Sequence, residues 1–430
     1  MQIRRDYSQP FFSTRRRRRN TGRLLFFYGL FMGAFLVFVF TQFSRLQLMA
    51  LDVVGMAPTP TPFASTWAQQ GYDLYLQGKL VEAAQAFEKA VEQQPDNINY
   101  LYEYGRILIE MDRPSSSTRP ISDADLASQI GDHAIEVAPN DVRSFALKAK
   151  ALIWQGDSES AIPIALRGFE LDPGYAPLLA VLARGYTNIG RYQQGLDYGQ
   201  RAVEADPMNT DAHRSYALAL ILVGERDAAI RELEDAININ PNLTGPYFEL
   251  AIQYVASNLY EEAVATYERV LTLEPRNAKA LLRLCETYSR IGQDEQAQGY
   301  CDDALTIDPD YSDAYRALGM VNYRRRNYEG AIENFQSCER TTPSSETTDI
   351  ECFYLRGLAH YYLGECDEAW TVLTDALRRI EELPIKEPVL SSTQEGLRLV
   401  TVSCAAYSTQ ALPTAIPPTA IPPTPLGFGA

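Results

Sequence analysis

A proline recurs along this chain at a nearly constant interval. One step of 44 residues is followed by six steps of 34, at Pro95, Pro139, Pro173, Pro207, Pro241, Pro275, Pro309 and Pro343. Because proline disrupts helix hydrogen bonding, this spacing divides the chain into repeating helical units, numbered here one to eight by their closing prolines. Such units bury their apolar faces against one another, so the period predicts a stacked array.

Two further positions in each unit carry small residues. Those twelve residues before the proline are Ala83, Ala127, Ala161, Gly195, Ala229, Ala263, Ala297 and Ala331. Those five residues before it are Ala90, Ala134, Gly168, Ala202, Ala236, Val270, Ala304 and Cys338. A spacing of seven puts both positions on one face of a helix, where we expect a second helix to pack closely.

An earlier helix is indicated in each unit by a small residue 24 before the proline, at Gly71, Ala149, Ala183, Ala217, Ala251, Cys285 and Gly319. Large residues stand one turn before several of these, at Trp67, Leu179, Tyr247 and Leu281. Glycine stands 17 before the proline at Gly78, Gly156, Gly190, Gly224 and Gly292. Glycine tolerates positive φ, so we expect a tight turn there between two antiparallel helices.

Two units depart from the period. Unit two holds ten extra residues, and we expect an excursion between its helices within 110–125. A ninth unit keeps the spacing at Gly357, Gly364 and Ala369, although its closing proline has moved to Pro384. We therefore count nine units.

These units resemble tetratricopeptide repeats, and unit one fills nearly every position of that family's pattern with Trp67, Gly71, Gly78, Ala83, Phe87, Ala90 and Pro95. The resemblance implies an all-α fold, a right-handed α-solenoid of about nine helix-turn-helix repeats over residues 64–383. Repeat arrays need a terminal cover, and Thr393 to Tyr407 is apolar at helical spacing. We expect a capping helix within 384–410.

The N-terminal residues predict a membrane anchor. Residues 1–23 carry eight Arg and one Asp, and residues 24–44 contain no charge. Twenty-one such residues suffice for one transmembrane helix, and the positive-inside rule places 1–23 in the cytoplasm and the repeat array outside it. A cleaved signal peptide is the alternative, although its apolar region is normally shorter. Gly29 and Gly33, spaced four apart, suggest the hypothesis of a homodimer through this helix.

Proline and threonine flank the array. We interpret residues 45–63, with Pro-Thr-Pro-Thr-Pro at 58–62, as a semi-rigid linker, and residues 411–430 as a disordered tail. The net charge is −16, and residues 24–430 alone sum to −23. An acidic body repels phosphates and anionic lipid head groups, so we set nucleic acid and membrane-surface binding by the array aside.

All six cysteines lie between residues 285 and 404, and this even, clustered set fits an oxidising compartment and the predicted topology. Repeat geometry, as the resemblance implies it, favours the pairs Cys285 with Cys301, Cys338 with Cys352, and Cys366 with Cys404. Six buried thiols acting as small apolar side chains are the alternative. No cysteine pair has zinc-ligand spacing, so we expect no metal site.

The sequence offers no enzyme chemistry. It has no phosphate-binding glycine loop, nucleophile elbow or His-Glu-x-x-His motif, and we expect no cofactor. His133, His213 and His360 fall in separate units, and we interpret His213 and His360 as packing residues.

The resemblance implies a concave groove lined by the first helices, where a partner's peptide segment lies. Carried over position by position, it places a basic stripe and an apolar patch in that groove, which together comprise Arg106, Arg143, Lys150, Arg184, Arg214, Leu218, Ile221, Phe248 and Ile252. These residues predict an acidic or C-terminal-carboxylate peptide with an apolar anchor. The alternative is that the basic residues pair with neighbouring Glu. Chaperone-docking members use groove Lys and Asn residues, and the Asn partners are missing beside Lys150 and Arg184.

The favoured function is therefore a non-catalytic, membrane-tethered scaffold that binds a partner protein, in cell-envelope assembly or recruitment. Two alternatives stay open. One is an organelle import receptor whose array faces the cytosol, which would hold six free thiols. The other is the regulatory subunit of an enzyme complex.

Overall fold

A computed structural model describes residues 32, 63–111, 121–342, 347–381 and 387–410. The chain divides into one unit of residues 1–62 and a second unit of residues 63–430. The predicted membrane helix, the dimer hypothesis and nearly all of the linker fall in the first, of which only Met32 is described, and the predicted tail also lies outside the described residues. No helix among the described residues combines the length and apolarity needed to cross a membrane.

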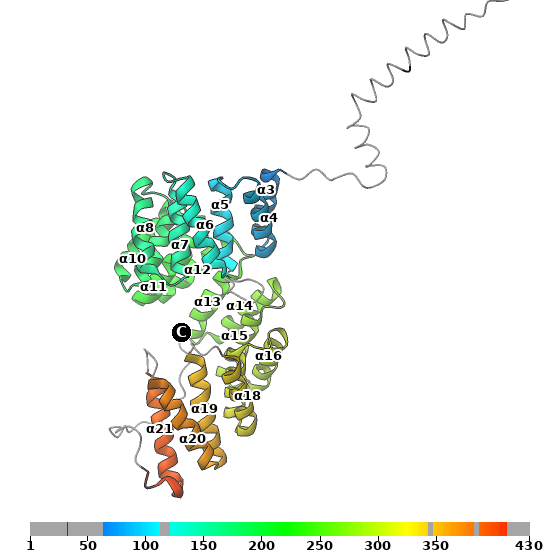
Figure 1. Ribbon diagram of the computed structural model, residues 1–430, viewed down its shortest axis with the longest axis vertical. Helices are drawn as coiled ribbons and strands as arrows, with labels where there is room; N and C mark the ends of the chain where they lie inside the picture. Colours follow the sequence, from blue (N-terminus) through cyan, green and yellow to red (C-terminus); the bar gives the residue numbers. More distant parts are fainter. Residues whose placement is uncertain (1–31, 33–62, 112–120, 343–346, 382–386, 411–430) are drawn as a thin grey trace, which may run out of the picture. The chain divides into compact units, whose positions relative to one another are not determined.

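Residues 63–410 form nine helix pairs, and the described part of the chain contains no strand (Figure 1). The first helices are α3 (Ala64–Leu76), α5 (Ile98–Met111), α7 (Val142–Trp154), α9 (Ala176–Asn188), α11 (Thr210–Val223), α13 (Thr244–Ala256), α15 (Ala278–Arg290), α17 (Ser312–Arg324) and α19 (Thr347–Leu363). The second helices are α4 (Leu80–Gln93), α6 (Asp123–Val137), α8 (Ser158–Leu171), α10 (Tyr192–Ala205), α12 (Arg226–Ile239), α14 (Tyr260–Leu273), α16 (Asp294–Ile307), α18 (Tyr328–Thr341) and α20 (Cys366–Glu381). A final helix, α21 (Val389–Ser403), follows within the range expected for the cap.

The small residues of each unit lie where the helices approach most closely. Ala83 and Ala90 of α4 are fully buried, and so are the corresponding alanines of units five and seven. A larger side chain at these positions would have to push two backbones apart, because protein interiors are packed without spare room. The alternation of small and large residues in the sequence therefore fixes the distance between helices.

The turn within most pairs has positive φ, as the glycine pattern predicted. Gly78, Gly156, Gly190, Gly224, Gly292 and Gly364 all adopt φ between 75° and 91°. Units six and eight carry Asn258 and Arg326 at the same position, and both have φ of 59°. The fold thus imposes the left-handed turn even where the sequence does not supply glycine.

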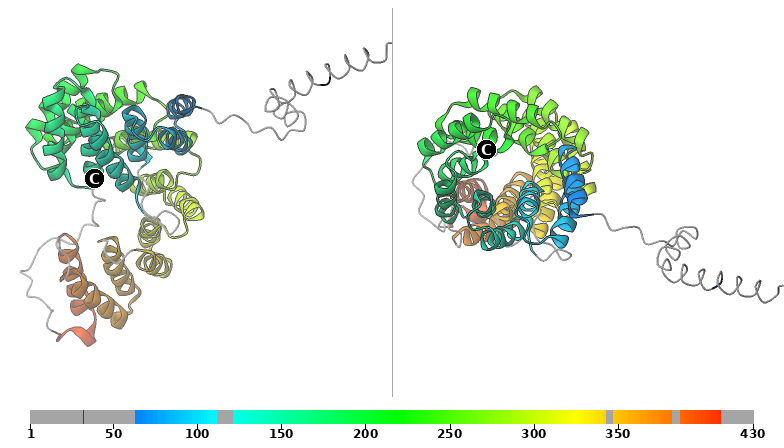
Figure 2. Two further views of the ribbon diagram at one scale, coloured as in Figure 1. Left: turned by 45° about the horizontal axis from the view of Figure 1, so that its top comes forward. Right: turned by 90° about the horizontal axis from the view of Figure 1, so that it is seen from above.

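Successive helix pairs rotate, so that unit one comes beside the junction of units five and six (Figure 2). The amide of Asn242, which precedes α13, donates a hydrogen bond of 2.8 Å to the carbonyl oxygen of Leu76 at the end of α3. Gly78 lies so close that a β-carbon built on it would stand 2.2 Å from the Asn242 carbonyl oxygen. Segments 166 residues apart are therefore in direct contact.

Three disulfides join the C-terminal helices. Cys285 of α15 is bonded to Cys301 of α16, and Cys338 of α18 to Cys352 of α19. Cys366 at the start of α20 is bonded to Cys404 behind α21, which fastens the final helix to unit nine. These are the pairs that the repeat geometry favoured over six free thiols.

Candidate functional site

Charged side chains from five first helices meet on the inner side of the array. Arg214 of α11 donates hydrogen bonds of 3.0 Å to both carboxylate oxygens of Glu110 on α5. On its other side Arg214 donates to Glu249 of α13 at 2.9 and 3.0 Å. The side chains of Arg214 and Glu110 are only 8% and 7% exposed. One guanidinium thus links units two, five and six.

Two more cations complete this group. The ammonium of Lys150 on α7 lies 2.5 Å from Asp211 of α11, and Arg184 of α9 lies 3.3 Å from Glu249. We call the six residues the inner charge network: Lys150, Arg184, Arg214, Glu110, Asp211 and Glu249. Three positive charges face three negative charges, so the network is neutral as a whole.

The electrostatics keep three members of this network ionised, namely Glu249, Arg214 and Asp211. Burial alone would raise the pKa of Glu249, but Arg214 and Arg184 outweigh it and hold that pKa below the ordinary value. Burial likewise opposes the charge of Arg214, yet Glu110 and Glu249 raise the pKa of its guanidinium well above normal. The pKa of Asp211 is depressed in the same way, by Lys150 and Arg214 against burial. Glu249 and Asp211 therefore carry charge at neutral pH.

A cavity of about 750 Å³ opens beside the network. Its walls come from α5, α7, α9, α11, α13 and α15, and from the turn between α3 and α4. The apolar part of the lining is Leu80, Val81, Ile109, Met111, Trp154, Phe248, Ile252 and Leu273. The charged part is Lys79, Glu82, Glu110, Arg184, Arg214, Glu249, Glu274, Lys279 and Arg283. The volume lies in the range of ligand-binding cavities, while the lining carries more charged residues than apolar ones.

The structure brings together four of the residues that the sequence predicted for a partner: Arg184, Arg214, Phe248 and Ile252. Lys150 lines a small adjoining pocket with Trp154 and Asp211. Leu218 and Ile221 are half-buried and do not line the cavity in the described part of the chain.

The two remaining predicted residues, Arg106 and Arg143, lie outside the cavity lining. Arg106 pairs with Glu103 at 2.5 Å and stacks over the Tyr75 ring. Arg143 pairs with Asp141 at 2.6 Å and bonds to Asn99. Each of the five basic residues predicted for the groove already has a carboxylate partner within the chain.

Two cations on α15 were not predicted from the sequence. Lys279 is exposed and lies 5.0 Å from the centre of the Phe248 ring, and it makes no ion pair within the described residues. Arg283 pairs with Glu286 through Nη1 at 2.7 Å, while its buried Nε has no hydrogen-bond partner in the described chain. Lys279 stands 30 residues before its closing proline, as Arg143 does in unit three. That equivalence was the signal that could have revealed it.

Other chemistry-bearing residues lie away from this cavity. None of the three histidines lines it among the described residues. The six cysteines are all taken up in disulfides and cannot serve as metal ligands as they stand.

Comparison with known proteins identifies the repeats. Family models described as tetratricopeptide repeat match residues 64–97, 181–242 and 254–321. The chain therefore contains tetratricopeptide repeats, as the resemblance in the sequence indicated.

Several curated proteins are similar over part of their length. The TPR repeat-containing protein YpiA of Bacillus subtilis is 24% identical over 155 residues, which is 36% of each chain. The Hsp70-Hsp90 organizing protein of Triticum aestivum is 22% identical, covering 65% of this chain and 41% of the relative. DnaJ homolog subfamily C member 3 of Homo sapiens is 21% identical, covering 70% of this chain and 57% of the relative. The chain thus spans only about a third to just over half of the length of these relatives.

Two solved structures align with this chain at TM-scores below 0.5. The Cut9 and Hcn1 heterotetramer of the APC/C aligns with a TM-score of 0.48 at 14% identity, covering 77% of this chain and 76% of that one. A tetratricopeptide repeat protein from Parabacteroides merdae aligns with a TM-score of 0.46 at 16% identity, covering 60% and 98%.

Proposed function

We propose that this chain is a non-catalytic scaffold that holds a segment of a partner protein in the cavity lined by α5 to α15. The observation that supports this most is the cavity itself, in which Trp154, Phe248 and Ile252 present apolar surface beside charged groups. A wheat relative is named as an organizing protein for two chaperones, which is the same class of function.

The charge distribution suggests what the segment carries. The inner charge network is neutral, so Arg184 and Arg214 contribute little net attraction for an anion. Within the described residues, Lys79 and Lys279 line this cavity without an ion pair, and the buried Nε of Arg283 lacks a hydrogen-bond partner. We therefore propose a segment whose carboxylate reaches α15 while an apolar side chain packs on Phe248 and Ile252.

Crosslinking in native membranes tests this proposal. A photoreactive residue at position 248 should capture a partner that mass spectrometry identifies, and one at the exposed position 276, outside the cavity, should not. Affinity for the captured segment should then fall about tenfold or more in Lys279→Glu, since a charge-assisted contact becomes repulsive. Arg276→Glu is the matched control, because it makes the same charge change three residues away. Equal loss in both variants, or capture at 276 only, would contradict the proposal.

Tethering to a membrane through residues 24–44, with the array on the extracytoplasmic side, belongs to the same proposal. The arginine excess of residues 1–23 supports it, and so do the three disulfides, since such bonds persist in oxidising compartments. A role in cell-envelope assembly or recruitment would follow. Alkylation of thiols in freshly lysed cells tests the placement: no free thiol is expected, and six alkylated cysteines would favour a cytosol-facing receptor instead.

A further inference from the structure

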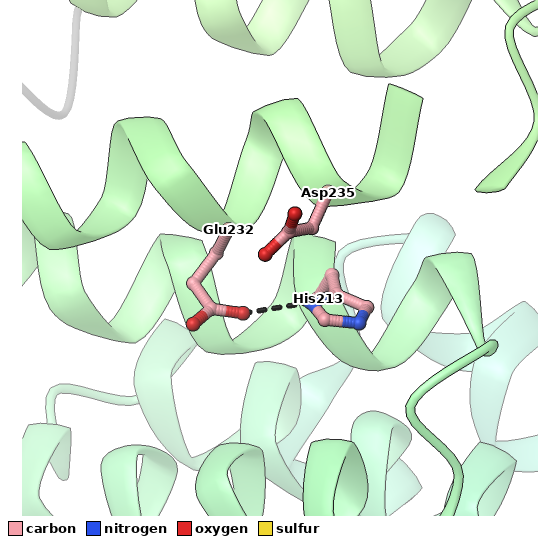
Figure 3. A group of neighbouring side chains, drawn as sticks. All are labelled: His213, Glu232 and Asp235. Carbon is pink, nitrogen blue, oxygen red and sulfur yellow. Dashed lines mark hydrogen bonds and ion pairs between the residues drawn. The ribbon is translucent and has the colours of Figure 1, made fainter. Parts of the chain in front are cut away.

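We propose that unit five carries a binding site for a divalent transition-metal cation, with Zn²⁺ as the reference ion. Its ligands are His213 of α11 and the pair Glu232 and Asp235 of α12 (Figure 3). One ligand atom from each residue lies within 4.8 Å of the other two. A nitrogen with two carboxylate oxygens is a ligand set that Zn²⁺ accepts in proteins, with the fourth position left to water. None of the three residues lines the cavity of the proposed function.

The orientation of the His213 ring favours metal binding. Its Nε2 lies 3.0 Å from the carbonyl oxygen of Pro207, which can only accept a hydrogen bond, so Nε2 carries a proton. The other nitrogen, Nδ1, then faces the two carboxylates, and Glu232 Oε2 is 2.7 Å away. Histidines that bind metals commonly donate their second ring N–H to a backbone carbonyl in this way, which fixes the ring.

The three ligands also differ in exposure, as an accessible site requires. The His213 ring is buried at 5% exposure, Glu232 is half-buried and Asp235 is exposed. The histidine is thus held rigidly from inside, while the outer carboxylate stays open to solvent, from which an ion and its water ligand can arrive. Asp235 makes no hydrogen bond in the described part of the chain, although its charge faces His213.

Unit six shows what this position does without a metal. Tyr247 stands where unit five has His213, and its hydroxyl lies 3.0 Å from the carbonyl oxygen of Pro241. The contact with the proline carbonyl therefore needs no histidine. Thr266 and Arg269 stand where unit five has its two carboxylates, and they lie beside Tyr247. Packing thus accounts for the ring of His213, but not for two acids gathered at its Nδ1.

Without a metal, a proton takes the cation's place. Burial lowers the pKa of His213, but hydrogen bonds to Glu232 and Pro207 outweigh it and raise that pKa. The hydrogen bond between His213 and Glu232 still leaves the carboxylate of Asp235 without a hydrogen-bond partner in the described part of the chain. A divalent cation would neutralise both carboxylates and would link α11 to α12.

Titration calorimetry on the full chain, freed of metal with a chelator, tests the proposal with ZnCl₂. We expect one Zn²⁺ per chain at micromolar affinity or tighter, accompanied by a rise in melting temperature. Asp235→Asn should weaken binding at least tenfold, and it alters an exposed residue that takes no part in the pair between His213 and Glu232. His213→Tyr should abolish binding. The introduced tyrosine should keep the contact with the Pro207 carbonyl, as Tyr247 does with Pro241 in unit six.

The matched control is Asp303→Asn, since Asp303 occupies the position of Asp235 in unit seven, where no histidine faces it. It should leave affinity and stoichiometry unchanged. Circular dichroism of each variant checks that the fold is intact. The proposal is overturned if the wild type binds no Zn²⁺, or if Asp235→Asn and His213→Tyr bind it as well as the control does, because the ion would then sit elsewhere.

Discussion

Units one to six and units seven to nine repeat the same helix pair, but different interactions hold them. In the first region Arg214 joins side chains from α5 and α13, and Glu110 lies 104 residues from it along the chain. In the second region three disulfides join residues 14 to 38 apart. Charge thus connects distant units of the N-terminal region, and covalent bonds connect adjacent helices of the C-terminal region.

The difference shows how the two ends of an array can be completed. A terminal repeat lacks one neighbour and so loses part of its stabilising interface. Unit one regains contacts from the segment before α13, through Asn242 and Leu76. Unit nine is covered by α21 instead, and the disulfide between Cys366 and Cys404 fastens that helix. One end is closed by the geometry of the superhelix and the other by an added helix.

Reducing the disulfides should reveal the largest difference in stability between the two regions. Closing a loop of about 15 residues stabilises a fold by roughly 3 kcal/mol, so losing three disulfides should unfold much of α15 to α21. Hydrogen exchange with a non-thiol reductant should show faster exchange in those helices, while α5 to α11 keep their protection. Cys366→Ala with Cys404→Ala should release mainly α21. Equal loss of protection in both regions would refute independent stabilisation.

Removing Arg214 should produce the next largest effect, confined to the other region. Arg214→Met leaves Glu110 buried without its partner, which should cost about 3–5 kcal/mol in the free energy of unfolding. Chemical denaturation measures the loss. Arg398→Met is the control, since the Arg398 side chain, which pairs with Glu395, is 43% exposed and its loss should cost less than about 1 kcal/mol. Adding Glu110→Gln and Glu249→Gln to Arg214→Met should restore part of the stability.

Alanine substitutions at two glycines in equivalent turns test how much the contact with Asn242 stabilises unit one. Gly78 and Gly156 both have positive φ, so an alanine at either should cost about 1–2 kcal/mol. Only at Gly78 would the new methyl group meet Asn242, since nothing lies within 4 Å at Gly156. Gly78→Ala should therefore destabilise more and should expose α3 and α4 to hydrogen exchange. Identical effects of both variants would show that the contact with Asn242 contributes nothing.

Acid should produce the smallest effects, opposite in the two regions. The pKa of Glu249 is depressed, so its contribution exists above the unfolded pKa of about 4.3 and is lost as the pH falls below it. Burial raises the pKa of Glu351 in α19, so its contribution is present at low pH and is lost as the pH rises through the folded pKa. Hydrogen exchange corrected for pH should show α19 gaining protection as the pH falls toward about 4.3, and α13 losing it only below that pH. Glu351→Gln should abolish the gain in α19.

The repeat period and the pattern of small and large residues predicted the fold because both are set within a single helix pair. A proline every 34 residues, small residues at two helix positions and glycine at the turn set each helix pair without reference to distant units. Helix pairing then brought Cys285 close enough to Cys301 for a disulfide. Asn258 and Arg326 adopt positive φ without glycine, so the turn follows from the unit as a whole rather than from that residue alone.

The site could be predicted only in part. The sequence placed Arg184 and Arg214 in the groove because their position within a repeat determines which way they face. Their pairing with Glu110 and Glu249 depends on how far each unit rotates relative to the last, and no spacing in the sequence encodes that rotation. For the same reason the closing contact of Asn242, and with it one wall of the cavity, could not be predicted.

The contact between Leu76 and Asn242 would affect the binding kinetics of the partner segment in the proposed function. A groove that is open along one side can receive a peptide along its whole length. A groove closed by a contact such as the one between Leu76 and Asn242 requires the peptide to enter from one end, or requires that contact to open first. Association that depends on such a gating step is slower than simple encounter, and departure meets the same barrier. The residence time of a captured chain would therefore depend on Asn242, a residue that need not touch it.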